Sequence, residues 1–316
     1  MVFPATQDVI LPSDDKLAVG NASVPLSAGD EWADAPHPAF RTEKTIGPGK
    51  LAAATDADLI WQEIIAAAVA MTLREPRLQF RVRELVLERV SLADAIAKIL
   101  ARRMACGDMR EPELHALLKE TFEIEKPIMT RIAADLIAVK ARDPACQDYL
   151  HVLLNMKGFH ALETHRISHA LWQREQPDLA FALANMASLA FCVDIHPAAR
   201  IGAGVMFDHG TGIVVGETAE IGDNVSVLQN VTLGGTGKER GDRHPKIRNG
   251  VLLGAGAKVL GNIEVGSMCK VAAGSVVLES VPPHCTVAGV PARVVRRHAG
   301  GSPPAFDMDQ SVEMPD

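Results

Sequence analysis

Large aromatic side chains and long apolar runs are both scarce in this sequence, and each shortage excludes a class of protein. Aromatic residues make up only 4% of the 316 residues, although the hydrophobic share is 47%. These values favour a large core of aliphatic side chains and about two domains. No run of about 18 consecutive apolar residues occurs, so we expect no membrane span. The N-terminus lacks a basic segment followed by an apolar run, so we expect no signal peptide and a cytoplasmic chain.

Paired cysteines and excess positive charge are also missing. The five cysteines are scattered, without a CxxC pair, and their number is odd. We therefore expect free thiols in a reducing compartment. The formal net charge is -7, which argues against nucleic acid as a partner. An anionic ligand needs a local basic patch instead.

A six-residue period is the strongest pattern that the sequence does contain. Apolar residues occupy it, with one shift of two residues and one polar interruption, at Ile195, Ile201, Phe207, Ile213, then Ile221, Val227, Leu233, then Ile247, Leu253, Val259, Val265, Val271 and Val277. This period fits neither a helix nor a plain strand and is typical of hexapeptide repeats. Each repeat forms a short strand and a turn, and three repeats form one coil. We therefore predict a left-handed parallel β-helix.

The rest of the chain divides around these repeats. Residues 1–50 show no sustained period, and we expect a flexible N-terminal extension. Residues 51–192 carry helical spacing with acidic and Ser caps, and predict an all-helical domain. The β-helix spans 193–295 in this α+β prediction, and 287–295 closes its open end. We expect 296–316 to form a mobile C-terminal tail.

Two polar residues of the repeats are predicted to share a corner of the β-helix. One coil of three repeats places residue 212 above residue 194, and His209 lies three residues before 212. Asp194 is then within reach of His209 and orients its imidazole as a general base. The nucleophile in that arrangement is a hydroxyl group of the substrate. The alternative is that both are solvated turn residues.

A polar insertion at 234–246 interrupts the repeats and is predicted to loop out. Arg243 and His244 offer donors to a carboxylate, and the glycines offer backbone N–H groups. A second interpretation joins His196, His209 and His244 as zinc ligands between subunits of a β-helical trimer.

Several segments together resemble bacterial serine O-acetyltransferases. They are 194–199, 208–218, 231–238, 241–247 and 288–293, together with Lys157-Gly158-Phe159 in the helical part. The resemblance covers about residues 55–295. It implies an enzyme that moves acetyl from acetyl-CoA to the L-serine hydroxyl, without a permanently bound cofactor. It also implies a trimer of β-helices, two trimers joined through their helical domains, and a role at the first step of cysteine synthesis.

The resemblance also implies roles for single residues. His209 is the base and Asp194 its orienting partner. The serine ammonium is assigned to Asp208, Asp143 and Pro144, the carboxylate to Arg243 and His244, and the CoA arm to Gly235, Ala255 and Lys270. L-cysteine shares the ammonium and carboxylate of serine, so we expect feedback inhibition at the same site. The alternatives are acetyl transfer to homoserine or a sugar, and a γ-type zinc carbonic anhydrase.

The C-terminal segment resembles the family tail that binds cysteine synthase. The similarity begins at Phe306-Asp307-Met308-Asp309-Gln310, but the sequence ends Met314-Pro315-Asp316, without the isoleucine that the family inserts. An unpaired acidic end is costly to bury. We therefore expect weak or absent binding of cysteine synthase through these last residues.

Overall fold

The computed structural model describes residues 55–107, 109–237, 240–298 and 300–311. All of the described residues belong to one compact unit, Ala52–Asp316. The extension predicted at 1–50 and the last residues, 312–316, lie outside the described residues. Among the described residues, no helix is both long and apolar enough to cross a membrane.

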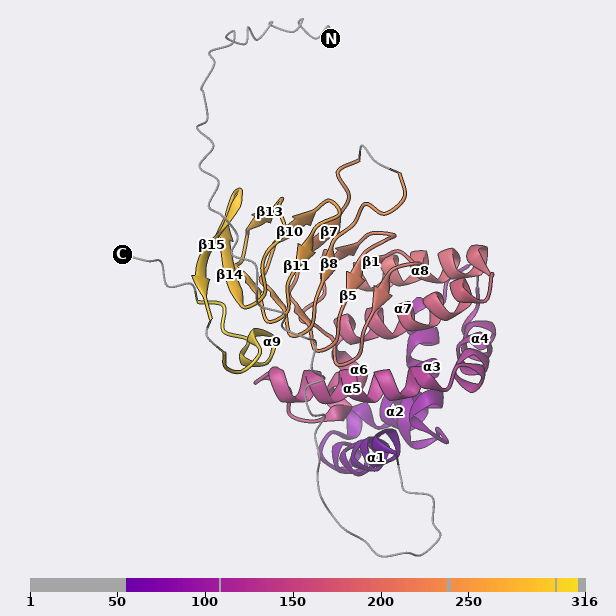
Figure 1. Cartoon of the computed structure of the whole chain (residues 1–316). Helices are drawn as coiled ribbons and strands as arrows, with labels where there is room; N and C mark the ends of the chain where they lie inside the picture. The colour runs from indigo at the N-terminus through magenta and orange to yellow at the C-terminus, as the bar shows by residue number, and fades with distance from the viewer. Residues whose placement is uncertain (1–54, 108, 238–239, 299, 312–316) are drawn as a thin grey trace, which may run out of the picture. The chain divides into compact units, whose positions relative to one another are not determined.

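The N-terminal part of the second unit is helical, as predicted (Figure 1). Its α-helices are α1 (Asp56–Arg74), α2 (Gln79–Val82), α3 (Leu92–Met104), α4 (Glu111–Ile124), α5 (Pro127–Arg142), α6 (Tyr149–Asn155), α7 (Lys157–Gln173) and α8 (Pro177–Phe191). Thr55 and Ser91 cap α1 and α3 with their hydroxyl groups. Pro76 follows the end of α1, and Pro144 follows the end of α5, because proline cannot continue a helix.

From Asp194 the chain winds into a prism of three parallel sheets. The strands are β1 (Asp194–Ile195), β2 (Arg200–Ile201), β3 (Met206–Phe207), β4 (Val214–Val215), β5 (Glu220–Ile221), β6 (Ser226–Val227), β7 (Thr232–Gly234), β8 (Lys246–Ile247), β9 (Leu252–Leu253), β10 (Lys258–Leu260), β11 (Glu264–Val265), β12 (Lys270–Val271) and β13 (Val276–Val277). Sheet A has the order β1-β4-β7-β10-β13, sheet B contains β2, β5, β8 and β11, and sheet C contains β3, β6, β9 and β12. All thirteen apolar residues of the predicted period are buried, so the β-helix prediction is confirmed.

The predicted register of the first coil was wrong by two residues. Asp194 pairs with Val214, and Ile195 pairs with Val215. The two extra residues therefore lie before β4, within 208–213, and not after Ile213. Ile213 is apolar and buried directly before β4, so in the sequence it looks like a residue of the six-residue period.

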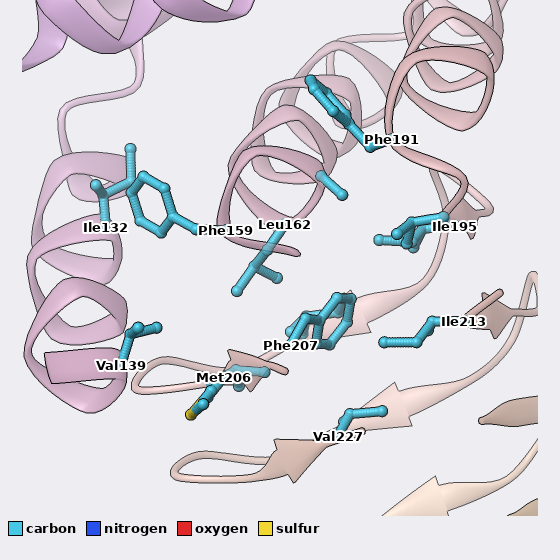
Figure 2. Packing of buried hydrophobic residues seen from close by; sticks show 14 of the residues in the cluster. Ile132, Val139, Phe159, Leu162, Phe191, Ile195, Met206, Phe207, Ile213 and Val227 are labelled. Atoms are coloured by element: carbon cyan, nitrogen blue, oxygen red, sulfur yellow. The ribbon is translucent and has the colours of Figure 1, made fainter. Parts of the chain in front are cut away.

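The two ends of the prism are covered by different elements. At the start, Phe159 and Leu162 of α7 and Ile132 of α5 pack towards Met206 and Phe207 of β3, so the helices and the first coil share one core (Figure 2). At the other end, β14 (Cys285–Gly289) continues sheet C, and β15 (Ala292–Arg297) pairs with it antiparallel. This hairpin is the predicted closing segment.

Part of the segment predicted as a mobile tail from residue 296 has regular structure. Strand β15 runs to Arg297, and α9 (Pro304–Asp307) packs on the outer face of sheet C. The Arg142 guanidinium lies over the Phe306 ring at 4.5 Å from its centroid, and Ser226 donates a hydrogen bond to the Ala305 carbonyl. Burial of this apolar turn fixes a segment that its composition alone suggests is loose.

Candidate active site

Most of the predicted site residues lie at the two corners of the prism that bound sheet A. The first corner is the turn before each strand of sheet A, and it contains 208–213, 228–231 and 254–257. The second corner is the turn after each strand, and its described residues include 196–199, 216–219, 235–237 and 240–245. Backbone hydrogen bonds such as Asp208 N to Val227 O (2.8 Å) and His196 N to Val215 O (3.0 Å) hold successive turns of each corner together.

The first corner brings His209, Asp208 and Asp143 together. His209 has a left-handed backbone (φ 56°), and its Nε2 lies 3.7 Å from Asp208 Oδ1 with 73% of its side chain exposed. Burial raises the pKa of Asp208, the His209 charge lowers it, and the Asp143 charge raises it. Asp143 is the C-cap of α5 and lies beside Pro144. This corner therefore presents an accessible imidazole next to two carboxylates. The carboxylates could bind an ammonium group.

Asp194 begins β1 at the same end of sheet A, and its side chain is exposed. Among the described residues, no hydrogen bond joins it to His209; the His209 ring faces Asp208 instead. The revised register explains the difference, because the two extra residues between β3 and β4 lengthen the loop that carries His209. The orienting role of Asp194 thus stays a prediction.

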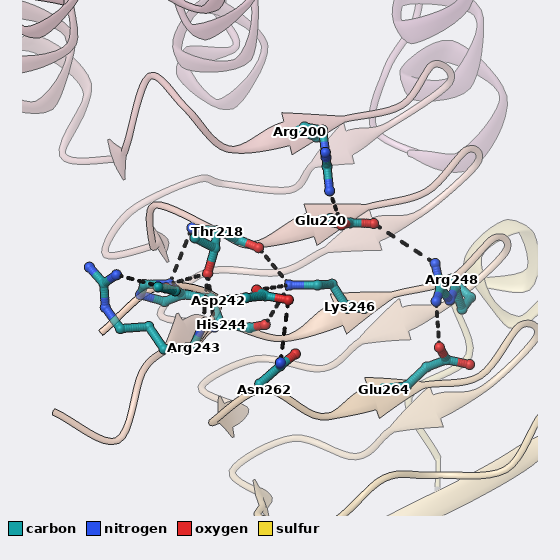
Figure 3. A network of polar contacts seen from close by, with 11 residues as sticks. Arg200, Thr218, Glu220, Asp242, Arg243, His244, Lys246, Arg248, Asn262 and Glu264 are labelled. Atoms are coloured by element: carbon teal, nitrogen blue, oxygen red, sulfur yellow. Dashed lines mark hydrogen bonds and ion pairs between the residues drawn. The ribbon is translucent and has the colours of Figure 1, made fainter. Parts of the chain in front are cut away.

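The second corner orders Arg243 and His244 through Thr218 (Figure 3). The Thr218 hydroxyl accepts hydrogen bonds from the backbone N–H groups of Arg243 (3.0 Å) and His244 (3.1 Å). Arg243 Nη2 donates to Glu217 Oε2 at 2.7 Å. The Lys246 ammonium donates to the Thr218 and His244 carbonyls and to Asp242, and so closes the base of the loop.

The hydrogen bonds of His244 determine its tautomer. Its Nδ1 accepts from the Thr218 backbone N–H at 3.2 Å, and the Thr218 hydroxyl lies 2.9 Å away. Burial, and then the Arg243 charge, lower the pKa of His244. The neutral ring therefore carries its proton on Nε2 and donates from there, as a carboxylate ligand requires. Gly216 leaves space for this ring, since a Cβ there would lie 2.0 Å from His244 Cδ2.

Sequence reasoning gave no role to Glu217 and Thr218. Both follow β4. Because Val215 of β4 pairs with Ile195 of β1, they occupy the positions that Pro197 and Ala198 occupy one coil earlier. With the correct register, the repeat itself would have placed them beside the insertion.

The three residues assigned to the CoA arm are distributed over the prism. Gly235 lies at the second corner beside Arg243, and Ala255 lies at the first corner. Lys270 projects from β12 on sheet C, where its ammonium donates to the Ser311 carbonyl and lies 3.4 Å from Asp309 Oδ2. Within one chain these three residues do not meet.

The same separation applies to the whole candidate site. His209 with its carboxylates lies at one end of the sheet A strands, and Arg243 with His244 lies at the other. Within one chain, the strands of sheet A therefore separate the two groups. His196 shares the second corner, where its ring packs on Trp172 and Phe181. Within the described residues, no three His, Cys, Asp or Glu side chains gather as a metal site.

Comparisons with known proteins identify the family of the chain. Residues 60–164 match the family model "Serine acetyltransferase, N-terminal". The chain is 50% identical over 253 residues to the serine acetyltransferase of Salmonella typhimurium, covering 80% of this chain and 92% of the relative. A solved serine acetyltransferase in complex with cysteine superposes with a TM-score of 0.79 at 48% identity, covering 82% of this chain and all of the other. The serine acetyltransferase of Brucella abortus in complex with coenzyme A superposes with a TM-score of 0.75 at 48% identity. The match covers 76% of this chain and 96% of the Brucella chain.

Proposed function

Because the chain belongs to the serine acetyltransferase family and is therefore an acyltransferase, we propose that it transfers acetyl from acetyl-CoA to the L-serine hydroxyl. The products are O-acetyl-L-serine and CoA, and the reaction is the first step of cysteine synthesis from serine. One observation carries the assignment of serine as acceptor: carboxylates beside His209 at one corner complement an ammonium, and Arg243 with His244 at the other corner complements a carboxylate.

The proposed chemistry is direct transfer with His209 as general base. The serine oxygen attacks the thioester carbonyl while its proton moves to the exposed imidazole. The tetrahedral intermediate then collapses, the C–S bond breaks, and the imidazolium returns the proton to the leaving sulfur. Asp194, at the start of β1, is assigned the orienting role. Asp208 and Asp143 hold the serine ammonium.

We assign the complete site to two adjacent subunits of a trimer. The support is the separation of the two corners along sheet A. Acetyl-CoA then lies between two prisms, with Ala255 from one subunit and Gly235 from the other along its arm. The CoA complex of the Brucella relative supports CoA as the co-substrate.

L-cysteine is assigned to the serine site as an inhibitor. It carries the same ammonium and carboxylate, and a relative has been solved with cysteine bound. Inhibition is therefore competitive with serine. Cysteine inhibition that saturating serine does not relieve would contradict a shared site.

A thiol-release assay with serine, homoserine and a galactoside as acceptors tests the proposed function. Serine is expected to be the preferred acceptor, and His209→Ala should lower kcat by roughly 10²–10⁴. A preference for homoserine or the galactoside overturns the choice of substrate. Accumulation of an acetylated enzyme without serine overturns direct transfer.

A further inference from the structure

The first corner is a column of stacked turns that rises from the proposed base. The Asn230 N–H donates to the Thr211 carbonyl at 2.8 Å, the Gly256 N–H to the Gln229 carbonyl at 2.9 Å, and the Gly274 N–H to the Ala255 carbonyl at 2.8 Å. Along the prism axis the turns therefore present His209, Gln229 and Ala255 in succession. Adjacent turns are about 4.8 Å apart, the spacing of neighbouring β-strands.

Gln229 is the polar side chain between the proposed base and the residue assigned to the CoA arm. The residue is half-buried, but its Oε1 is completely buried, and none of the described residues donates a hydrogen bond to it. A buried side-chain oxygen without a hydrogen-bond donor is unusual. A donor that a ligand brings to this acceptor would therefore be stabilising.

Acetyl-CoA carries such a donor at a matching distance from its reacting carbon. In the proposed reaction the thioester carbonyl lies at the level of His209, because the attacking hydroxyl is held there. From the thioester, the arm continues through sulfur and two methylene groups to an amide N–H. An extended linkage of this kind spans about 5 Å, close to the rise of one turn.

We propose that Gln229 Oε1 accepts a hydrogen bond from the pantetheine amide N–H that lies next to the thioester of acetyl-CoA. This inference rests on the proposed function, since it uses the position of His209 as the base. Gln229 is then a positioning residue for the acyl donor. The contact fixes the position of the pantetheine arm along the prism axis, so that the thioester carbon lies beside the serine hydroxyl.

A pair of short acyl donors tests this contact directly. S-acetyl-N-acetylcysteamine contains the amide N–H, and its ester analogue has an oxygen in the place of that N–H. Wild-type enzyme should use the amide donor about 3- to 10-fold more efficiently, the range expected for one neutral hydrogen bond. In Gln229→Met, which keeps the length of the side chain without its polar atoms, the ratio should fall to about one. A ratio that is unchanged in Gln229→Met overturns the proposal.

This ratio separates the contact from a purely structural effect, because a damaged corner would slow both donors equally. Asn230→Gly is the matched control: Asn230 is exposed, adjoins Gln229, and has a left-handed backbone (φ 60°) that glycine accepts. It should keep the wild-type donor ratio. A rise in the KM for serine in Gln229→Met, with the donor ratio unchanged, would assign Oε1 to the serine ammonium and also overturn the proposal.

Calorimetric titration with CoA separates failure of this inference from failure of the proposed function. CoA contains the same amide, so Gln229→Met should raise its Kd about 3- to 10-fold. If serine is not acetylated but this shift is found, the proposed function fails and the contact stands. If serine is acetylated and the Kd of CoA is the same in both proteins, the contact fails and the function stands.

Discussion

Among single residues, Glu163 of α7 has the most unusual environment. It is completely buried beside Asp135 and Arg166, at the junction between the helices and the first coil. Arg166 donates to Asp135 and to the Gly202 carbonyl, and Val205 N–H donates to Asp135. One guanidinium neutralises only one of two buried carboxylates. Burial, and then the Asp135 charge, raise the pKa of Glu163 well above its usual value, so Glu163 keeps its proton when folded.

Glu163→Gln should therefore remove a pH-dependent loss of stability. Above about pH 4.5 the unfolded Glu163 releases its proton while the folded one retains it, so the unfolded state binds fewer protons. Wild-type stability then falls as pH rises towards the raised pKa, by at most about 1.4 kcal/mol per pH unit. Urea denaturation at pH 5, 6.5 and 8 should show that the free energy of unfolding of the variant increases relative to that of the wild type as the pH rises. Parallel pH profiles would mean that Glu163 is not protonated.

Arg243 is the residue for which a specific effect on serine binding is expected. Arg243→Ala removes the guanidinium at the second corner, so the KM for serine should rise at least about 10-fold, as for loss of a charged hydrogen bond. The KM for acetyl-CoA should change much less. Arg200→Ala is the control, because Arg200 pairs with Glu220 on the exposed face of sheet B, where an ion pair contributes little. Equal rises in both KM values for Arg243→Ala would contradict the carboxylate role.

At the scale of the element, α7 approaches the first coil more closely than any side chain at Gly158 permits. A Cβ at Gly158 would lie 2.0 Å from the Phe207 carbonyl oxygen. Phe207 directly precedes Asp208 and His209, so this contact fixes the strand that positions the proposed base. The helix itself would prefer alanine to glycine by about 1 kcal/mol, so packing and not helix propensity selects glycine here.

Gly158→Ala should consequently destabilise the protein by roughly 1–3 kcal/mol, the usual cost of overpacking a core. It should also lower kcat, because β3 must move together with the loop that carries His209. Gly107→Ala is the matched control, since nothing lies within 4 Å of a Cβ at Gly107. Thermal denaturation of both variants measures the difference. Equal melting temperatures for Gly158→Ala and wild type would show that α7 shifts to accommodate the added Cβ without loss of stability.

The elements also show which parts of the fold a sequence can predict. The repeat was readable because the inside of a narrow prism accepts aliphatic side chains at one position in six. The position of the two-residue shift was not readable, because Ile213 and Val215 are both apolar and both buried. Glu217 and Thr218 were missed for the same reason, since their place beside Arg243 depends on that register. The short helix α9 shows no sequence period, and its place depends on tertiary contacts with Arg142 and Ser226 that the sequence does not reveal.

At the scale of the whole molecule, the proposed division of the site between adjacent subunits of a trimer predicts that activity is a property of the oligomer. In a cyclic trimer each interface is heterologous, so the first corner of one subunit meets the second corner of the next. A His209→Ala subunit has a damaged first corner and an intact second corner. An Arg243→Ala subunit has the reverse. Neither variant alone forms an intact site, but a mixed trimer does.

Co-expression of the two variants should therefore give a higher kcat/KM for serine than either variant has by itself. With random assembly in equal amounts, about one quarter of the interfaces pair an intact first corner with an intact second corner. The kcat/KM for serine of the mixed enzyme should approach about one quarter of the wild-type value per subunit. Two inactive variants of the same corner, His209→Ala and His209→Asn, provide the control and should not complement each other. If the mixture of His209→Ala and Arg243→Ala is no more active than the separate variants, the site does not combine the first corner of one subunit with the second corner of another.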